Sequence, residues 1–426
     1  MVRYHRAEEY YIAMSESQRH SPQPPRLRNL QFSPIKQQDE QYIVLWDPTG
    51  LSAEKLIIPL NYFYLMQFFD GEHSLEQIGA EYLKKFGEFI LPDRMAKLIA
   101  DLDEKLFLEG ERFETARQAA IAAYRAAPVR PAAYAGKAYA ADPEPLKKEL
   151  ESFFTSKEGP DWKPSANAGK NLKGIIAPHY DVRQGGPIYA WAYKEVQEAT
   201  VPDVFVLIGT CQAGLEHGYA LTDKDFETPL GRVSVDRDII DVIRKRGAAS
   251  FFDEDISHKN EHSLEFQLPF LQYTVGAKKP FTIVPILTAF APDDLAHPEF
   301  LENVERFIRI MKETLTESAK AVCFVASAEL AHIGLRYGDN KPPTDFSFHK
   351  CMQWDMEMLK HVEQLDADAF ATFIRKEGNA RRISGFAAIY TMLKLMKAEK
   401  GEVLRYDRGV TDQFNSTVTY ASVVFY

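Results

Sequence analysis

Polar residues of the kinds used in acid–base and metal chemistry stand directly after apolar, strand-like stretches in the second half of the chain. They are His179 after "GIIAP", Cys211 and Gln212 after "DVFVLIG", Glu261 and His262 in "NEHSLEFQLPF", and Glu329 and His332 in "FVASAELAHIG". Ligands of sheets with parallel strands bind outside the carboxyl ends of those strands. The sequence therefore predicts that these groups meet in one cleft at a sheet edge.

Two histidines and one carboxylate from these groups are chemically sufficient to bind a divalent metal and leave positions open, as in non-haem iron sites. Glu329 and His332 are three residues apart, so both can face one point if the segment turns helically. Without a metal, His262 or His332 could act as a general base near neutral pH. Glu261 or Glu329 would then orient the ring.

Several of these residues also have a purely structural interpretation. His262 could cap and anchor its helix, because histidines at helix ends often make structural hydrogen bonds. Glu265 and Gln267 are assigned to the helix itself. Cys211 is a poor candidate for a nucleophile, because nothing in the sequence indicates what would lower its pKa.

Composition excludes some classes of protein. The chain has 426 residues and a formal net charge of −10, which disfavours a nucleic-acid partner because phosphate binding needs Lys and Arg. Its three cysteines are too few for a disulfide framework. No apolar run approaches the roughly 20 residues of a membrane span, and P-loop, G-x-G-x-x-G and G-x-S-x-G motifs are missing. We expect a soluble cytoplasmic protein.

The pattern of helix signals divides the chain. Residues 1–26 are a proline-rich lead, and residues 27–113 read as a strand and three helices, typical of a small winged-helix-like domain. Residues 114–130 are alanine-rich and then broken by prolines, which predicts a linker. Its proline-broken part, around Ala127–Ala133, should be exposed. The second domain covers residues 131–426.

The second domain alternates continuous apolar strands with helices, which predicts an α/β fold with a sheet covered on both faces. The expected strands are 174–178, 203–209, 281–287, 321–327 and two at the carboxyl end, with a hairpin at 227–235. The expected helices are 187–196, 236–246, 263–273 and 298–315, and several between 348 and 396.

The order of these motifs resembles the Memo-like proteins, including bacterial AmmeMemoRadiSam system protein B. "GIIAPHYDVRQGG", "VFVLIGTCQAG", "NEHSLEFQLPF" and "VASAELAHIG" carry the resemblance, which extends from Pro131 to the carboxyl end. It implies a fold similar to the class III extradiol dioxygenases, with a mixed sheet flanked by helices and a cleft where the histidines gather.

This chain departs from the family pattern at the metal site that the resemblance implies. Gln212 and Ala213 stand where relatives carry histidines, and Ser384 stands where many carry cysteine, so His179 alone remains of that set. Neutral amide and hydroxyl groups are weak ligands. Either His179, His332 and Glu329 form a rearranged site for iron, copper or zinc, or the cleft has lost its metal.

The segment "DGEHSLEQIGAEYLKKFG" with "LIADLDEKLFLEG" resembles the winged-helix peptide chaperone of pyrroloquinoline quinone biosynthesis. Together the two resemblances imply a cleft that binds a small molecule or peptide end, working beside a radical SAM partner. One alternative is a non-catalytic peptide-binding adaptor. Another is a non-haem metal-dependent oxidoreductase or dioxygenase.

Overall fold

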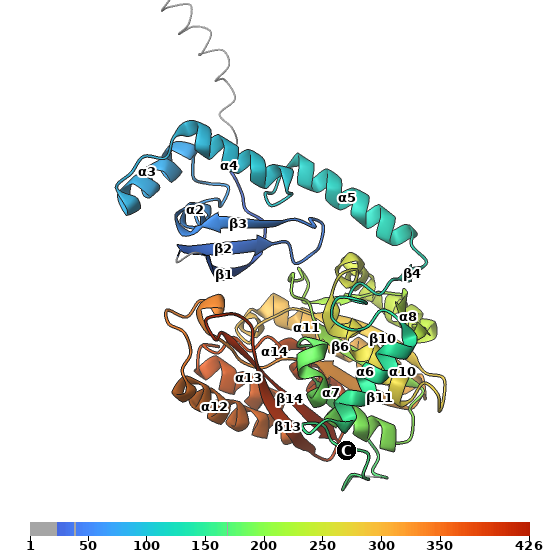
Figure 1. Ribbon diagram of the computed structural model, residues 1–426. Helices are drawn as coiled ribbons and strands as arrows, with labels where there is room; N and C mark the ends of the chain where they lie inside the picture. The colour runs from blue at the N-terminus through green and yellow to red at the C-terminus, as the bar shows by residue number, and fades with distance from the viewer. Residues whose placement is uncertain (1–23, 38–39, 168) are drawn as a thin grey trace, which may run out of the picture. The chain divides into compact units, whose positions relative to one another are not determined.

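The computed structural model describes residues 24–37, 40–167 and 169–426 (Figure 1). Most of the predicted lead, residues 1–26, lies outside this described part. The chain divides into two compact units, Met1–Ala120 and Ile121–Tyr426. No helix among the described residues is long and apolar enough to cross a membrane.

The first unit begins with an antiparallel sheet and continues with helices. Its strands are β1 (Gln31–Gln37), β2 (Glu40–Trp46) and β3 (Lys55–Pro59), in that spatial order. Its helices are α2 (Leu60–Met66), α3 (Leu75–Phe86) and α4 (Pro92–Glu104). Three strands thus precede the helices where the sequence indicated one, and the winged-helix likeness stays a prediction.

Sequence signals account for the ends of α3. The Ser74 hydroxyl accepts a bond from the Gln77 amide while the Gln77 side chain bonds the Ser74 amide, so two free donors at the helix start are satisfied. Gly87 ends the helix at φ 71°, a left-handed conformation that glycine adopts without strain. Ile78 and Tyr82, one turn apart, face the core of the unit.

The expected exposed break at Ala127–Ala133 is confirmed only in part, because Pro128 and Pro131 are exposed but Arg130 between them is buried. The helix α5 (Glu111–Ala126) continues through most of the predicted linker, and β4 (Val129–Arg130) then pairs in parallel with β8 (Asp225–Thr228). The Lys224 ammonium donates to the carbonyl oxygen of Ala127 at 2.6 Å, near the carboxyl end of α5. Arg130 is fully buried. Strand pairing and this buried arginine hold residues 127–133 in place. Neither can be predicted from the prolines in the sequence.

The second unit contains a mixed eight-stranded sheet, and the predicted α/β class is confirmed. Its spatial order is β12-β14-β5-β11-β6-β10-β7, with β13 paired to β14. The central four strands are parallel: β5 (Gly174–Ala177), β11 (Val322–Ser327), β6 (Val204–Thr210) and β10 (Thr282–Thr288). The others pair antiparallel: β7 (Tyr219–Leu221), β12 (His332–Ile333), β13 (Gly401–Val410) and β14 (Thr417–Phe425). β9 (Gly231–Val233) forms the expected hairpin with β8 outside this sheet.

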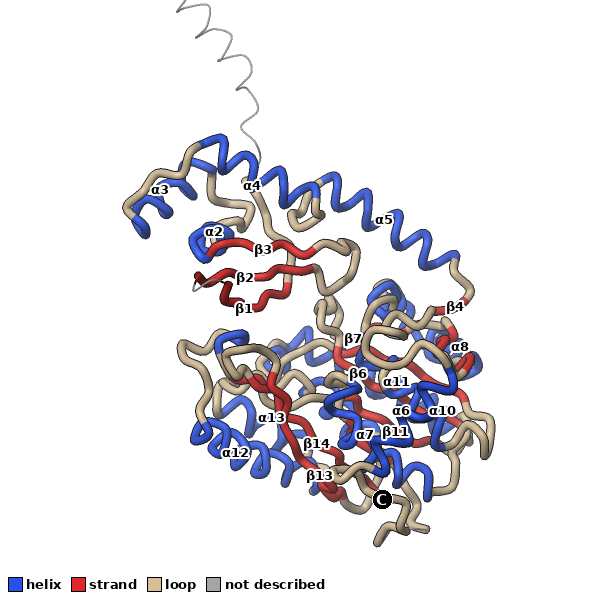
Figure 2. The backbone as a smooth tube through the Cα atoms, in the orientation of Figure 1, coloured by secondary structure: helices blue, strands red, loops and turns tan. Residues whose placement is uncertain are grey.

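Helices cover both faces of the large sheet (Figure 2). On one side lie α6 (Pro143–Thr155), α7 (Val182–Glu198), α9 (His262–Glu265) and α10 (Gln267–Thr274). On the other lie α11 (Pro298–Glu317), α12 (Asp345–Glu363), α13 (Ala367–Lys376) and α14 (Phe386–Leu395). The short α8 (Arg237–Ile243) packs on α11. Ser422 of β14 bonds the Ile188 carbonyl of α7, while Thr419 of the same strand bonds Asp355 of α12, so alternate side chains face opposite layers.

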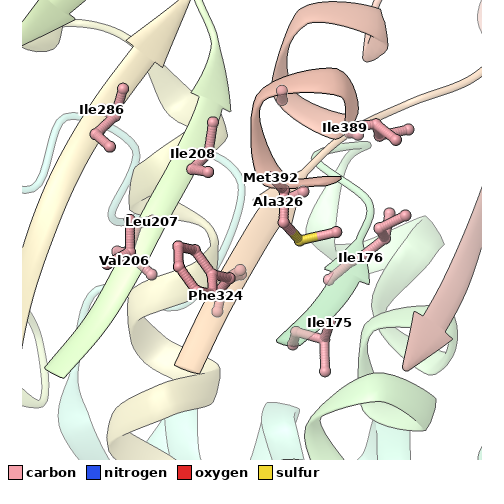
Figure 3. Close-up of a cluster of buried hydrophobic side chains, with 14 of the residues drawn as sticks. Ile175, Ile176, Val206, Leu207, Ile208, Ile286, Phe324, Ala326, Ile389 and Met392 are labelled. Carbon is pink, nitrogen blue, oxygen red and sulfur yellow. The ribbon is translucent and has the colours of Figure 1, made fainter. Parts of the chain in front are cut away.

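The core lies where α14 packs on the parallel strands. Ile389 and Met392 of α14 lie beside Ala326 of β11 and Ile176 of β5 (Figure 3). Every residue of β5 and β6 is buried. Strands buried on both faces have to be apolar throughout, which explains why these stretches show no alternation in the sequence.

A fully buried ion pair joins β4 to α9. The Arg130 guanidinium contacts the Glu265 carboxylate and also donates to the carbonyl oxygens of His258 at 2.7 Å and Glu261 at 2.8 Å. Glu265 in turn accepts the backbone amide of Tyr134 at 2.8 Å. Glu265, assigned from the sequence to its own helix, thus connects that helix to the segment after α5.

We expect Arg130→Ala to lower the free energy of unfolding of the second unit by about 3–5 kcal/mol, because it leaves the Glu265 charge buried and unpaired. Urea denaturation would measure the loss. Lys360→Ala, which breaks an exposed pair with Glu357, is the control and should cost about 0–1 kcal/mol. Equal losses in the two variants would contradict the role of the buried pair.

Candidate functional site

The carboxyl ends of β5, β6 and β11 bring the predicted groups together. His179 follows β5, Gln212 follows β6, and Glu329 follows β11. The parallel pairing of these strands puts their ends on one edge of the sheet. His262 reaches the same place from α9, its ring centroid 5.4 Å from that of His179 in an edge-to-face arrangement.

His179 lies at the centre of this cluster and its side chain is fully buried. Its Nδ1 lies 3.1 Å from the carbonyl oxygen of Ser327. A carbonyl oxygen only accepts, so Nδ1 carries the proton and Nε2 keeps its lone pair in the neutral ring. Burial lowers the pKa of His179, although the nearby Glu329 carboxylate works against this, so the neutral ring is favoured.

The Nε2 lone pair of His179 faces two groups. The Gln212 amide nitrogen lies 3.4 Å away, and Oε2 of Glu329 lies 3.5 Å away. Gln212 can donate to that lone pair, whereas Glu329 can only accept. The amide of Gln212 is therefore the natural partner of the neutral ring.

Gln267 holds the backbone around His179. Its amide donates to the carbonyl oxygen of Pro178 and to the hydroxyl of Ser327, each at 2.8 Å. Its oxygen accepts the Tyr193 hydroxyl at 2.9 Å. Sequence reasoning assigned Gln267 to its helix alone; the only available signal was a glutamine within an otherwise apolar helix face.

Glu329 and His332 meet, but the expected helical turn is absent. The two residues are joined by a non-helical segment that enters the short strand β12. Nε2 of His332 lies 3.1 Å from Oε2 of Glu329, and its Nδ1 lies 3.2 Å from the carbonyl oxygen of Leu330. Burial would raise the pKa of Glu329, but the attraction that His179 exerts when its ring is protonated and the hydrogen bond from His332 act in the opposite direction and lower the pKa. Glu329 is therefore ionised.

Glu261 and His262 form a second carboxylate–imidazole pair. Oε1 of Glu261 lies 3.1 Å from Nδ1 of His262 and accepts the amide of Ser263 at 3.0 Å. Its Oε2 accepts the backbone amide of Gln212 at 2.9 Å. Burial opposes the charge of Glu261, yet His262 and these two amides lower the pKa of Glu261 to about 2.

His262 differs from His179 in its electrostatic environment. Burial would lower the pKa of His262, but the adjacent Glu261 carboxylate outweighs it and raises the pKa. The His262 side chain is 25% exposed, against 14% for His332 and 0% for His179. The cluster is therefore most accessible at His262, whose Nε2 makes no hydrogen bond to any residue in the described part of the chain.

The remaining predicted residues border the cluster. Cys211 is buried, and this burial raises the pKa of its thiol, so a thiolate nucleophile is disfavoured. The hydroxyl oxygen of Ser384 is buried and lacks a hydrogen-bond partner among the described residues, while its backbone amide donates to Leu330 at 3.4 Å. Next to it, Gly385 donates to the Glu329 carbonyl at 2.9 Å. A side chain at position 385 would collide with Glu329 and Ala328.

The arrangement of the donor groups gives no support to a metal site. Within residues 24–37, 40–167 and 169–426, no group of three or more His, Cys, Asp or Glu side chains is placed to hold one. The polar neighbour that follows β6 is the neutral amide of Gln212, a weak ligand for such ions. Metal ligation by His179, His332 and Glu329 stays a prediction, and no chemistry below passes through a metal.

The paired ionisations of Glu261 and His262 define a pH window. Glu261 has a folded pKa of about 2 against an ordinary 4.5, so its contribution to stability is present above about pH 4.5 and lost as pH falls through 2. His262 has a raised pKa against an ordinary 6.5, so its contribution is present below pH 6.5 and lost as pH rises through the folded pKa. The pair stabilises the fold most between these two limits.

We expect Glu261→Gln to lower the pKa of His262, because it removes the charge that outweighs the burial of the ring. NMR titration of the ring carbon-bound protons would show the His262 transition at lower pH than in the unaltered protein. Glu357→Gln, at an exposed glutamate, is the matched control and should leave that transition in place. A His262 transition unchanged in Glu261→Gln would contradict the pairing.

Comparison with known proteins agrees with the resemblance. A family model described as "Memo-like protein" matches residues 130–424. A MEMO1 family protein of Aquifex aeolicus is 26% identical over 411 residues, covering 94% of this chain and 100% of the relative. Relatives of the same description from Methanopyrus kandleri (30% identity, 70% of this chain, 98% of the relative) and Thermococcus kodakarensis (31%, 70%, 99%) align over a shorter part.

The extent of these matches distinguishes the two units. The two archaeal relatives are covered almost entirely by 70% of this chain, whereas the Aquifex aeolicus relative aligns with nearly all of it. The matched family model covers most of the second unit, where the mixed sheet and the histidine cluster lie. The Memo fold is related to that of the class III extradiol dioxygenases, in agreement with the mixed sheet flanked by helices. The chain therefore belongs to the Memo-like family.

Proposed function

We propose that this chain binds a small molecule, or the end of a peptide, at the cluster around His179, and that His262 exchanges a proton with it. The observation that carries the proposal is the contrast between the two adjacent rings. His179 is held neutral with a lone pair on Nε2, while the pKa of His262 is raised by Glu261. The cluster thus offers a ligand one acceptor and one charged donor.

This pair of groups selects a class of ligand. The imidazolium of His262 makes a charge-assisted hydrogen bond to an oxygen anion, such as a carboxylate or a phenolate. A ligand hydroxyl or amine would take the place of the Gln212 amide, 3.4 Å from the neutral Nε2 of His179, and donate to that lone pair. A ligand with both groups a few ångströms apart fits, as hydroxy acids, catechols and peptide carboxyl ends do.

Proton exchange follows from the same geometry. Glu261 contacts Nδ1 of His262 and is itself fixed by two backbone amides, so the ring is held in one orientation and leaves its other nitrogen, Nε2, for the ligand. A carboxylate that orients an imidazole in this way is the usual support of a histidine general acid or base. His262 would give its proton to the ligand and recover it from solvent.

We expect His262→Ala to weaken binding at this cluster at least tenfold, because it removes a charge-assisted hydrogen bond worth about 1.5–3 kcal/mol. Protein-observed NMR with catechol, lactate and a free tripeptide as probes would measure the dissociation constants. His297→Ala changes an exposed histidine at the start of α11 and serves as the control. Probes that shift no resonance of the cluster in the unaltered protein would contradict the proposal.

The peptide-binding adaptor is a second candidate because of a feature of the first unit. Large apolar side chains at the end of α3 and in the connection to α4 are exposed: Phe86 at 39%, Phe89 at 81% and Leu91 at 58%. Exposed apolar groups that gather in one loop often mark a docking surface. A radical SAM protein remains the proposed partner, on the strength of the two sequence resemblances.

We expect Phe89→Ser to reduce co-purification of a co-expressed radical SAM protein of the same genome, because it removes the most exposed aromatic ring of this loop. Quantitative mass spectrometry of the affinity-purified complex would measure the loss. Val410→Ser, which removes an apolar side chain 48% exposed in the second unit, is the control. Retention of the partner by Phe89→Ser would count against docking at this loop.

A further inference from the structure

The segment between Glu329 and His332 is held by backbone hydrogen bonds from two other parts of the chain. The Leu330 amide donates to the Thr419 carbonyl at 2.8 Å, and the Thr419 amide donates to the Ala331 carbonyl at 2.9 Å. The Ala331 amide donates to the Thr419 hydroxyl at 2.9 Å. The His332 amide donates to the Arg381 carbonyl at 2.7 Å.

One buried carboxylate joins the two residues that make these bonds. Asp355 of α12 is fully buried and accepts the Thr419 hydroxyl at 2.6 Å and the Tyr406 hydroxyl at 2.7 Å. Its other oxygen accepts from the Arg381 guanidinium. Glu377 bonds the far side of that guanidinium at 2.9 and 2.7 Å. Helix α12, strand β14 and the segment before α14 are therefore tied at one point.

This arrangement accounts for a contact that local structure does not produce. A helical turn would bring residues 329 and 332 onto one face by itself, but the segment is not helical. Extended residues instead alternate between faces. The position of His332 relative to Glu329 is then set by the backbone bonds to Thr419 and Arg381, which Asp355 fixes.

We infer that Asp355 is a positioning residue for the candidate site, acting through Thr419 and Arg381 to hold the Glu329–His332 pair against His179. The positioning role is argued from geometry alone, and only its effect on ligand binding rests on the proposed function. Asp355 bonds to the residues that support the segment, and its bonds leave the segment's own side chains free to face the cluster. Its effect on ligand binding is therefore indirect.

The test uses Thr419, because Thr419→Val removes the hydroxyl that links Asp355 to Ala331 at nearly constant volume. Thr419→Ser keeps the hydroxyl and should behave as the unaltered protein does. Thr391→Val is the matched control, since it removes another buried hydroxyl, bonded to Tyr219 at 3.0 Å. Asp355→Asn is a second variant, and its measurements are interpreted only if circular dichroism shows that the variant is folded.

Two measurements are made on each variant. The first is the NMR signal of the His332 Nε2–H proton, which is slow to exchange while it is bonded to Glu329. The second is the dissociation constant for catechol, lactate and the tripeptide. We expect Thr419→Val to lose the protected signal. We also expect it to bind the probes on the order of tenfold more weakly, because small displacements of site groups weaken their interactions with a ligand. Thr419→Ser and Thr391→Val should keep both.

The outcomes separate the inference from the proposed function. A protected His332 signal that persists in Thr419→Val, or that Thr391→Val also loses, overturns the positioning role. Loss of the His332 signal in Thr419→Val, with the signal kept in Thr391→Val, supports the positioning role whether or not the unaltered protein binds a probe. Absence of probe binding by the unaltered protein would count against the proposed function instead.

Discussion

A carboxylate that is buried must be paired, and this requirement organises the second unit around its candidate site. An unpaired charge in the protein interior is destabilising by several kcal/mol. Glu261, Glu265 and Glu329 are all buried beside the carboxyl ends of the parallel strands. Each is satisfied differently: Glu265 by an arginine, Glu261 by two amides and an imidazole, and Glu329 by the imidazole of His332.

These pairings give chemically similar residues different properties. His179 and His262 are adjacent rings of the same type, yet burial lowers the pKa of one and a carboxylate raises that of the other. Separating the ionisation of neighbouring groups in this way is how sites obtain an acid and a base from one side-chain type. This difference between two adjacent rings is the feature on which the proposed proton exchange depends.

Much of this architecture is predictable from the sequence. Continuous apolar runs identify the parallel strands, because burial on both faces leaves no alternation, and strand ends identify His179, Gln212 and Glu329. What local patterns could not supply is any contact made over long sequence distance. Arg130 reads as part of a proline-broken linker, yet it pairs with a glutamate 135 residues away. Likewise Glu329 and His332 meet as expected but through Thr419, which no spacing rule connects to them.

Gly385 and Ser384 are neighbours with different constraints on change. The backbone at Gly385 passes so close to Glu329 and Ala328 that no side chain fits, so this position is limited by space. Ser384 presents a buried hydroxyl that bonds to no described residue, so its hydrogen-bonding capacity is unused within the described chain. A change of the side chain at position 384 can therefore alter the polar groups beside the cluster while the adjacent glycine preserves the path of the chain.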